Sequence, residues 1–176
     1  VVVACDPWNA ARLLGSSKPA LAHGTRTLYF AAPQSPLQDP ILVLNGDGVG
    51  MVRSVRVPSQ VSSGYAPADQ ALISVSLRSE STEGQEGELS EQVRTELSQW
   101  FGAAVHQWQH LRTFEIPHAL PHQDSIQPPS TGPRFSIDPS GVLVCGDAHD
   151  IASIQGAMRS GREVAEHLIK SARFGP

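Results

Sequence analysis

The sequence predicts an α+β fold, in which an antiparallel sheet with one helix is inserted into part of an α/β layer. Short alternating or apolar runs, separated by Pro, Gly and Asn, are typical of antiparallel strands, and they fill the region from 25 to 77. The two ends of the chain differ from this middle, because each is a hydrophobic strand followed by a helical pattern. We therefore expect residues 1–15 and 141–176 to share one α/β domain, and 16–140 to form a second.

The first predicted elements are a buried strand, VVVAC, and a short helix over residues 7–14. Pro7 suits the first helical position, and Gly15 follows the helix end. Strands are then expected at the following four stretches: 25–31, 41–44, 51–57 and 71–77. The chain begins on VVVACDP without a lead-in, which suggests a fragment or a processed product of a longer protein.

The glycine-rich stretch LNGDGVGMVRSV predicts a hairpin. Its glycines at 46, 48 and 50 have the spacing G-x-G-x-G, which differs from the G-x-G-x-x-G of a dinucleotide-binding turn. The residues after it alternate as a strand does. Asn45-Gly46 or Asp47-Gly48 therefore supplies the turn between two strands.

The second half of the chain is predicted to contain a loop, a helix, two strands and a final helix. An exposed loop is expected at 78–88, and a helix from Leu89 to Phe101 that ends at Gly102. A strand at 108–117 should end at Pro117, and 118–140 should form a long irregular connection. The last elements are a strand at 142–145 and a helix from about Ser153 to Lys170.

Composition and charge favour small molecules or other proteins as partners. The 176-residue chain is 40% hydrophobic and has a net charge of -4, with a pI near 5.9. No cluster of Lys and Arg indicates a nucleic-acid partner, and no apolar run approaches the ~20 residues of a transmembrane helix. Cys5 and Cys145 each close an apolar run, which is typical of buried free thiols in a reducing, cytoplasmic compartment, although a disulfide between them is an alternative.

Several other residue groups indicate no particular chemistry. His106 and His110 are four residues apart, but their segment is predicted to be a strand and no third zinc ligand follows. We expect no metal site. Asp147, His149 and Asp150 resemble a ligand set without a defined geometry, and no G-x-S-x-G turn supports a serine hydrolase. No catalytic residue is identified.

The stretch VLVCGDAHDIASIQGAMRSG, residues 142–161, is a candidate ligand site. Asp147 follows a buried strand, where parallel sheets bind their ligands, and Ser153 is a good N-cap for the helix after it. Gly156 and Gly161 each cost about 1 kcal/mol relative to Ala inside a helix. Close approach of another backbone or of a flat ligand would offset this cost, and simple packing of the helix on the sheet is an equal alternative.

This stretch also resembles the C-terminal flavin-binding segment of the amine oxidase and phytoene desaturase superfamily. In that family a strand ends in Gly-Asp, and the next helix opens with a pattern such as S-[MI]-[EQ]-G-A-x-x-S-G. The resemblance implies an FAD site in which Gly146 and Asp147 contact the ribityl chain and the start of the helix faces the isoalloxazine ring. The residues implied at the helix start are Ser153, Ile154 and Gln155.

Two weaker similarities occur in the order that the family has. VVVACDPWNAARLL, which contains Ala4 and Cys5, resembles the strand and turn that lead from the FAD domain into the substrate domain. LRTFEIPHALP resembles the strand that returns from it. The resemblance thus assigns 1–15 and 141–176 to part of the FAD-binding domain, and 16–140 to the substrate-binding domain. Alternation in the predicted strands suggests Tyr29, Trp108 and His110 as substrate-binding residues.

The resemblance implies an FAD-dependent oxidoreductase that oxidises an amine or an apolar small molecule by hydride transfer to flavin. The G-x-G-x-x-G turn that holds the pyrophosphate is absent from this sequence. We therefore expect this chain alone to be inactive and to hold FAD weakly or not at all, its missing partner being the N-terminal FAD-binding portion. One alternative is a non-catalytic ligand- or protein-binding module derived from the substrate domain. Another is an α+β domain whose similarity to the flavin-binding segment reflects helix–sheet packing alone.

Overall fold

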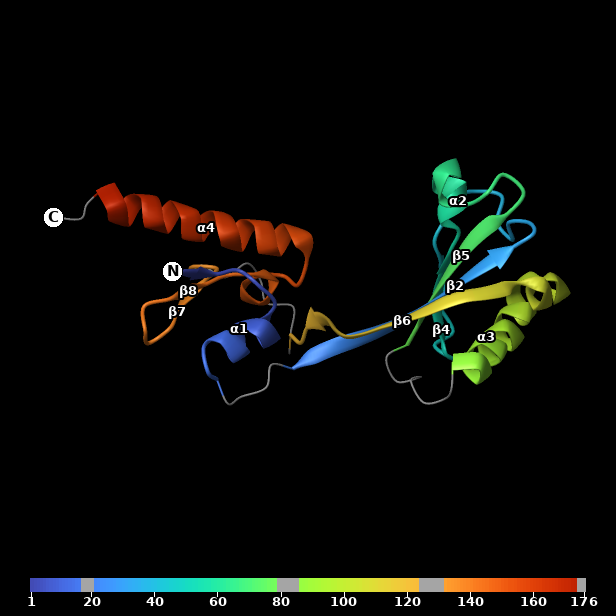
Figure 1. Cartoon of the computed structure of the whole chain (residues 1–176), viewed down its shortest axis with the longest axis horizontal. Helices are drawn as coiled ribbons and strands as arrows, with labels where there is room; N and C mark the ends of the chain where they lie inside the picture. Colours follow the sequence, from blue (N-terminus) through green and yellow to red (C-terminus); the bar gives the residue numbers. More distant parts are fainter. Residues whose placement is uncertain (17–20, 79–85, 124–131, 174–176) are drawn as a thin grey trace. The chain divides into compact units, whose positions relative to one another are not determined.

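The computed structural model of the chain describes residues 1–16, 21–78, 86–123 and 132–173 (Figure 1). The chain divides into two compact units. Unit 1 consists of Val1–His23 and His118–Pro176, and unit 2 of Gly24–Pro117. That these units are a flavin domain and a substrate domain stays a prediction.

Unit 1 is built around a small three-stranded sheet in the order β1-β8-β7, in which β1 (Val2–Val3) is parallel to β8 (Leu143–Val144). β7 (Ser136–Ile137) is antiparallel to β8. Three helical segments complete the unit: α1 (Pro7–Leu13), the 3-10 helix η3 (Asp147–His149) and the long α4 (Ile154–Arg173). Its small core contains Leu143, Cys145 and Val164, with Phe135 packed against them.

The helix α1 forms for the reasons that the sequence suggests. Pro7 occupies the first turn of the helix. Backbone amides there have no acceptor inside the helix, so the lack of an amide proton in proline costs no hydrogen bond. The Asp6 side chain caps the helix by accepting a hydrogen bond from the Asn9 amide at 2.9 Å. Gly15, with φ +66°, follows the end of the helix.

Unit 2 contains most of a five-stranded sheet in the order β3-β4-β5-β2-β6, since the start of β2 and the end of β6 extend past its bounds. Its strands are β2 (Ala22–Ala32), β3 (Val43–Leu44), β4 (Val52–Arg56), β5 (Ala71–Leu77) and β6 (Gln109–Pro121). Its helical segments are α2 (Pro58–Val61), η1 (Ser63–Tyr65), α3 (Glu86–Phe101) and η2 (Ala103–Gln107). β2, β4 and β5 pair antiparallel, as alternation predicts.

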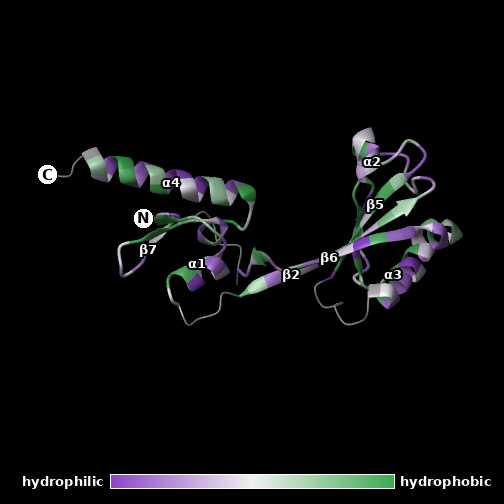
Figure 2. Cartoon of the chain, viewed as in Figure 1, coloured by the Kyte–Doolittle hydropathy of each residue, from purple (hydrophilic) through white to green (hydrophobic). Residues whose placement is uncertain are grey.

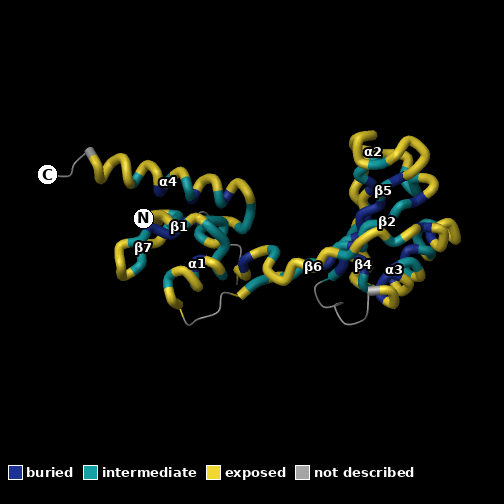
Figure 3. The backbone as a smooth tube through the Cα atoms, viewed as in Figure 1, coloured by how far each residue is buried: buried dark blue, intermediate teal, exposed yellow. Residues whose placement is uncertain are grey.

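The core of unit 2 lies between one face of this sheet and α3. Alternate residues of β2, Leu28 and Phe30, are fully buried, and so are Leu89, Val93 and Leu97 of α3. The spacing of the three helical residues places them on one face of α3, which explains why α3 packs on the sheet. Figure 3 shows this concentration of buried backbone along β5 and β2.

The glycine-rich stretch is a hairpin between β3 and β4, as predicted. The Asn45 side chain closes it by donating to the carbonyl oxygens of Val49 and Val52, at 2.7 and 2.9 Å. The carboxylate of Glu96 on α3 accepts a hydrogen bond from the amide of Met51 at 2.8 Å, which fixes the hairpin to the helix.

Three sequence-based expectations were wrong in their bounds. β6 continues through Pro117 to Pro121, because it is an edge strand and a proline there need not break a ladder. α3 begins at Glu86, inside the predicted loop 78–88, of which residues 79–85 lie outside the described part. The predicted irregular connection 118–140 contains the end of β6 and the strand β7, while 124–131 are not described.

Within the described ranges, no helix is both long and apolar enough to cross a bilayer.

Candidate functional site

The candidate site begins where the parallel strands β1 and β8 end. Val3 of β1 is paired with Val144 of β8, so Cys5 and Gly146 follow just beyond the same edge of the sheet. Gly146 has φ +150°, a backbone conformation that side chains disfavour, and a Cβ there would lie 3.3 Å from the Cys5 carbonyl oxygen. The chain can therefore turn out of β8 at this point only because residue 146 is a glycine.

Asp147 is the residue that this turn presents. It is half-buried at the start of η3, and among the described residues its carboxylate has no hydrogen-bond partner. A carboxylate at the carboxyl end of a parallel strand is well placed to accept hydrogen bonds from hydroxyl groups of a ligand.

A cavity of about 190 Å³ lies at this strand edge. It is lined by Cys5, Pro7, Ala10, Val144, Cys145, Gly146, Ala148 and His149. Complete ligand pockets commonly measure roughly 300–1,000 Å³, so the cavity has room for only part of a large cofactor. Of the residues predicted to bind a cofactor, Cys5 and Gly146 line the cavity, whereas Ala4 is exposed beside it.

The start of α4 completes the candidate site. The Ser153 hydroxyl accepts a hydrogen bond from the Gly156 amide at 3.0 Å and donates one to the Ile151 carbonyl at 3.2 Å, so Ser153 is the N-cap that the sequence predicts. Ile154 and Gln155 are the first two residues of the helix, and both are exposed. Their amides have no acceptor inside the helix and lie at the positive end of its dipole.

The two glycines of α4 have different surroundings. A Cβ at Gly156 would lie 2.0 Å from the Ile151 carbonyl oxygen, so the backbone before the helix folds back onto this glycine. A Cβ at Gly161 would meet no atom of the described chain within 4 Å. The expected close approach is therefore found at Gly156 only.

Ser160 ties the Gly146 turn to α4. Its side chain is fully buried, its hydroxyl accepts a hydrogen bond from the Gly146 amide at 3.0 Å, and it donates one to the Arg134 carbonyl. The sequence alone did not indicate this role. The available signal was a small polar residue one turn after Gly156, on the same face of the helix.

An ion-pair network holds the segment before β7 against the same helix. The buried Asp150 carboxylate lies 3.2 Å from Nε of Arg134 and 2.8 Å from Nε of Arg159. Arg134 also pairs with Glu163. Hydrogen bonds from the amide and guanidinium of Arg134 hold the pKa of Glu163 below its ordinary value. Asp150 thus has a structural role as the shared partner of two arginines.

His149 lies between the cavity and β7. Its Nε2 atom is 3.0 Å from the Ser136 hydroxyl, while Nδ1 is buried and has no hydrogen-bond partner within the described ranges. Burial lowers the pKa of His149 below its ordinary value, and the nearby Asp147 carboxylate opposes this effect. Burial also raises the pKa of the Cys145 thiol, with a further contribution from Cys5, and both cysteines are free thiols.

The three residues predicted to bind substrate do not share one face of unit 2. Tyr29 lies on the face opposite to the core, since its neighbours Leu28 and Phe30 point into the core, and its ring meets Phe114 edge-on at 5.7 Å. Trp108 is only 3% exposed and packs in the core.

His110 also lies on the core side, with its ring 5.5 Å from that of Phe30. Trp108 and His110 thus lie on the same side of the sheet, and their role in substrate binding stays a prediction. The register between β6 and β2, however, puts them beside Phe30 and away from Tyr29.

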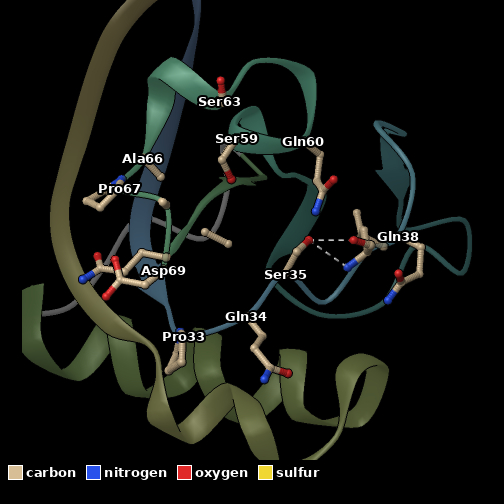
Figure 4. Close-up of a pocket in the computed structure, with 14 residues that line it drawn as sticks. Pro33, Gln34, Ser35, Gln38, Ser59, Gln60, Ser63, Ala66, Pro67 and Asp69 are labelled. Atoms are coloured by element: carbon tan, nitrogen blue, oxygen red, sulfur yellow. Dashed lines mark hydrogen bonds between the residues drawn. The ribbon is translucent and has the colours of Figure 1, made fainter.

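Among the described residues, unit 2 carries at least three hollows. Tyr29 lines one of about 570 Å³, which also contains Arg56 and Tyr65. Another, of about 440 Å³, is polar and is lined by hydroxyl and amide side chains (Figure 4). Its hydroxyl groups already stabilise loops: the Ser35 hydroxyl donates to the Leu37 carbonyl oxygen and accepts from the Leu37 amide, and the Ser59 hydroxyl accepts from the Leu72 amide at 3.1 Å.

Comparison with known proteins decides the family. Residues 1–169 match the sequence pattern of the family described as flavin containing amine oxidoreductase. The chain belongs to this family. No curated protein matches the chain at a significant level.

Two solved structures have a fold similar to that of this chain. An oxidoreductase from Methanosarcina mazei is similar with a TM-score of 0.53 and 13% identity, over 92% of this chain and 37% of that chain. A crystallised protein of Pyrococcus furiosus is similar with a TM-score of 0.51 and 16% identity, over 89% of this chain and 35% of that chain. The chain thus spans little more than a third of these two structures.

The residues of unit 1 fit the FAD that the family implies. Gly146 leaves the strand edge open, and the Asp147 carboxylate, which has no hydrogen-bond partner among the described residues, could accept from ribityl hydroxyls. The Ser153-capped helix start carries amide protons for an electron-rich ring.

Proposed function

We propose that this chain forms the side of an FAD site that holds the ribityl chain and faces the flavin ring, in a flavin-dependent oxidoreductase. One observation carries the proposal most strongly. The unpaired Asp147 carboxylate directly follows the Gly146 turn, at the carboxyl end of a parallel strand pair. This is the edge of an α/β sheet at which ligands bind.

Each residue has a role that its chemistry supports. Asp147 accepts hydrogen bonds from ribityl hydroxyls, with Gly146 giving the ligand access to the strand end. The amides of Ile154 and Gln155 donate toward the electron-rich edge of the ring, oriented by the Ser153 cap. Ala4 and Cys5 bound the site from the end of β1.

A bound flavin would supply a hydride acceptor: one carbon of the C–N or C–C unit of an amine or apolar substrate would lose its hydrogen as a hydride, and the neighbouring atom would release a proton as the double bond forms. The residues of this chain orient that cofactor and exclude water from it. Unit 2 would bind substrate on the face of its sheet that carries Tyr29, while Trp108 and His110 pack on the core side of this sheet.

We further propose that the nucleotide half of the FAD site is supplied by residues outside this chain. The coverage of 35% and 37% of the two structural relatives supports this. So do four exposed apolar side chains of α4, which share one side of the helix: Ile154, Met158, Leu168 and Ile169. Figure 2 shows that hydrophobic residues recur along α4. Such a group of exposed apolar side chains on a monomeric surface commonly marks a face that another part of a protein covers.

The test is the FAD affinity of the intact protein that contains this chain, measured for wild type and for Asp147→Ala. Loss of charge-assisted hydrogen bonds should weaken FAD binding by about tenfold or more. Asp39→Ala in unit 2 is the matched control, because it removes the same charge from an exposed loop. Equal FAD affinity in all three proteins would contradict the proposed role of Asp147.

A further inference from the structure

The hollow beside Tyr29 has the size and lining of a site for an apolar small molecule. Its volume of about 570 Å³ lies within the range of ligand pockets. It lies entirely within unit 2, and its lining is mainly apolar: Tyr29, Pro40, Ile41, Leu42, Arg56, Val57, Pro58, Val61, Tyr65 and Leu72.

Arg56 is the charged member of this lining. It stands on β4 opposite Ser74 of β5, and its Nε atom donates a hydrogen bond to the Ser74 hydroxyl at 3.3 Å. Ser74 is a buried residue, so the guanidinium is anchored at its inner nitrogen. The two terminal nitrogens of Arg56 have no partner within the described part of the chain.

This arrangement fits a ligand that carries a carboxylate. A guanidinium presents its donors as a planar fork that matches the two oxygens of a carboxylate, and burial of the apolar part of the ligand strengthens such a pair. None of the described residues that line the hollow carries a carboxylate, so a protonated amine would meet the like charge of Arg56 without a counter-ion.

We propose that the Tyr29 hollow binds apolar molecules with a carboxylate head group, through the fork of Arg56. The apolar body lies among Leu42, Val61 and Leu72, and the two tyrosine rings flank it. The inference rests on the proposed function in one respect, namely that the molecules bound in the hollow are the substrates of the oxidoreductase. Binding itself requires nothing but unit 2.

The experiment is an amide chemical-shift titration of the full chain with three probes that share one apolar body: octanoate, octanol and octylamine. We expect octanoate to bind about tenfold more tightly than octanol, and octylamine to bind most weakly. The shifted amides should include those of Leu42, Val57 and Leu72. Equal binding of the three probes, tighter binding of octylamine, no binding at all, or shifts confined to other residues would each overturn the proposal.

Two variants make the test specific. Arg56→Gln should abolish the preference for octanoate over octanol, leaving octanol binding unchanged. Arg53→Gln removes the same charge from an exposed residue of the same strand that does not line the hollow, and should keep the preference. A preference that survives in Arg56→Gln would contradict the role of Arg56.

The outcome is independent of the flavin site. A failure of octanoate binding leaves the Asp147 result untouched, and a loss of the Asp147 effect leaves this titration interpretable, because the two sets of residues lie in different units.

Discussion

Replacing Gly156 by alanine should destabilise unit 1, although alanine is the better helix former. The new Cβ would lie 2.0 Å from the Ile151 carbonyl oxygen and 3.1 Å from its carbon. Real Cβ contacts do not fall below 3.0 Å, so backbone atoms must move by about 1 Å. Overpacking of this kind costs about 1–3 kcal/mol, against a gain of about 1 kcal/mol from helix propensity.

We expect the overpacking cost to lie near the upper end of this range, because the clashing atom is the backbone carbonyl oxygen of Ile151. This atom also accepts the hydrogen bond of the Ser153 hydroxyl. The net loss for Gly156→Ala is then about 1–2 kcal/mol in the free energy of unfolding. Gly161→Ala is the matched control in the same helix. With open space around it, the same substitution should stabilise by up to about 1 kcal/mol.

Urea unfolding followed by circular dichroism measures both effects. The reasoning is refuted if the two variants change stability by the same amount, or if Gly161→Ala is the more damaging of the two. Such results would mean that helix propensity alone, and not the approach of Ile151, governs residue 156.

Three further predictions concern the same unit. Ser160→Ala should lower the free energy of unfolding by about 1–3 kcal/mol in urea melts, because the buried Gly146 amide and Arg134 carbonyl lose their partner. Burial lowers the pKa of His149 in the folded chain, so the unfolded chain binds a proton at this residue at a higher pH than the folded chain does. The free energy of unfolding should therefore fall as the pH drops below the ordinary pKa of histidine. The variant His149→Gln should lack this part of the pH profile. The purified chain should show no flavin absorbance, whereas a yellow preparation would contradict the need for a second half of the site.

Local patterns predicted most of the secondary structure. β5 has the predicted bounds, since ALISVSL is an alternating run between polar segments. α1 was located from Pro7 and Gly15, which act on the backbone next to them. The bounds of β6 were wrong because the effect of Pro117 depends on whether its strand lies at the edge of the sheet. That position is a property of the whole sheet.

Local patterns also predicted part of the candidate site. Strand end and helix cap are local features, and they led to Asp147 and Ser153, whereas Gly146 was implied by the family resemblance. The links from Ser160 to Gly146 and to Arg134 join residues 14 and 26 positions apart. Likewise, alternation gives the faces within one strand, but the pairing of β6 with β2 decides that His110 meets Phe30 and Phe114 meets Tyr29.

The central claim is that Asp147 and the start of α4 contact a flavin. The most direct measurement is a crystal structure of the intact flavin-loaded protein, in which the distances from the Asp147 carboxylate to the ribityl hydroxyls are read. The account predicts a hydrogen-bond distance of about 2.5–3.0 Å, with the Ile154 and Gln155 amides facing the ring. A bound flavin whose ribityl chain lies away from Asp147 would contradict it.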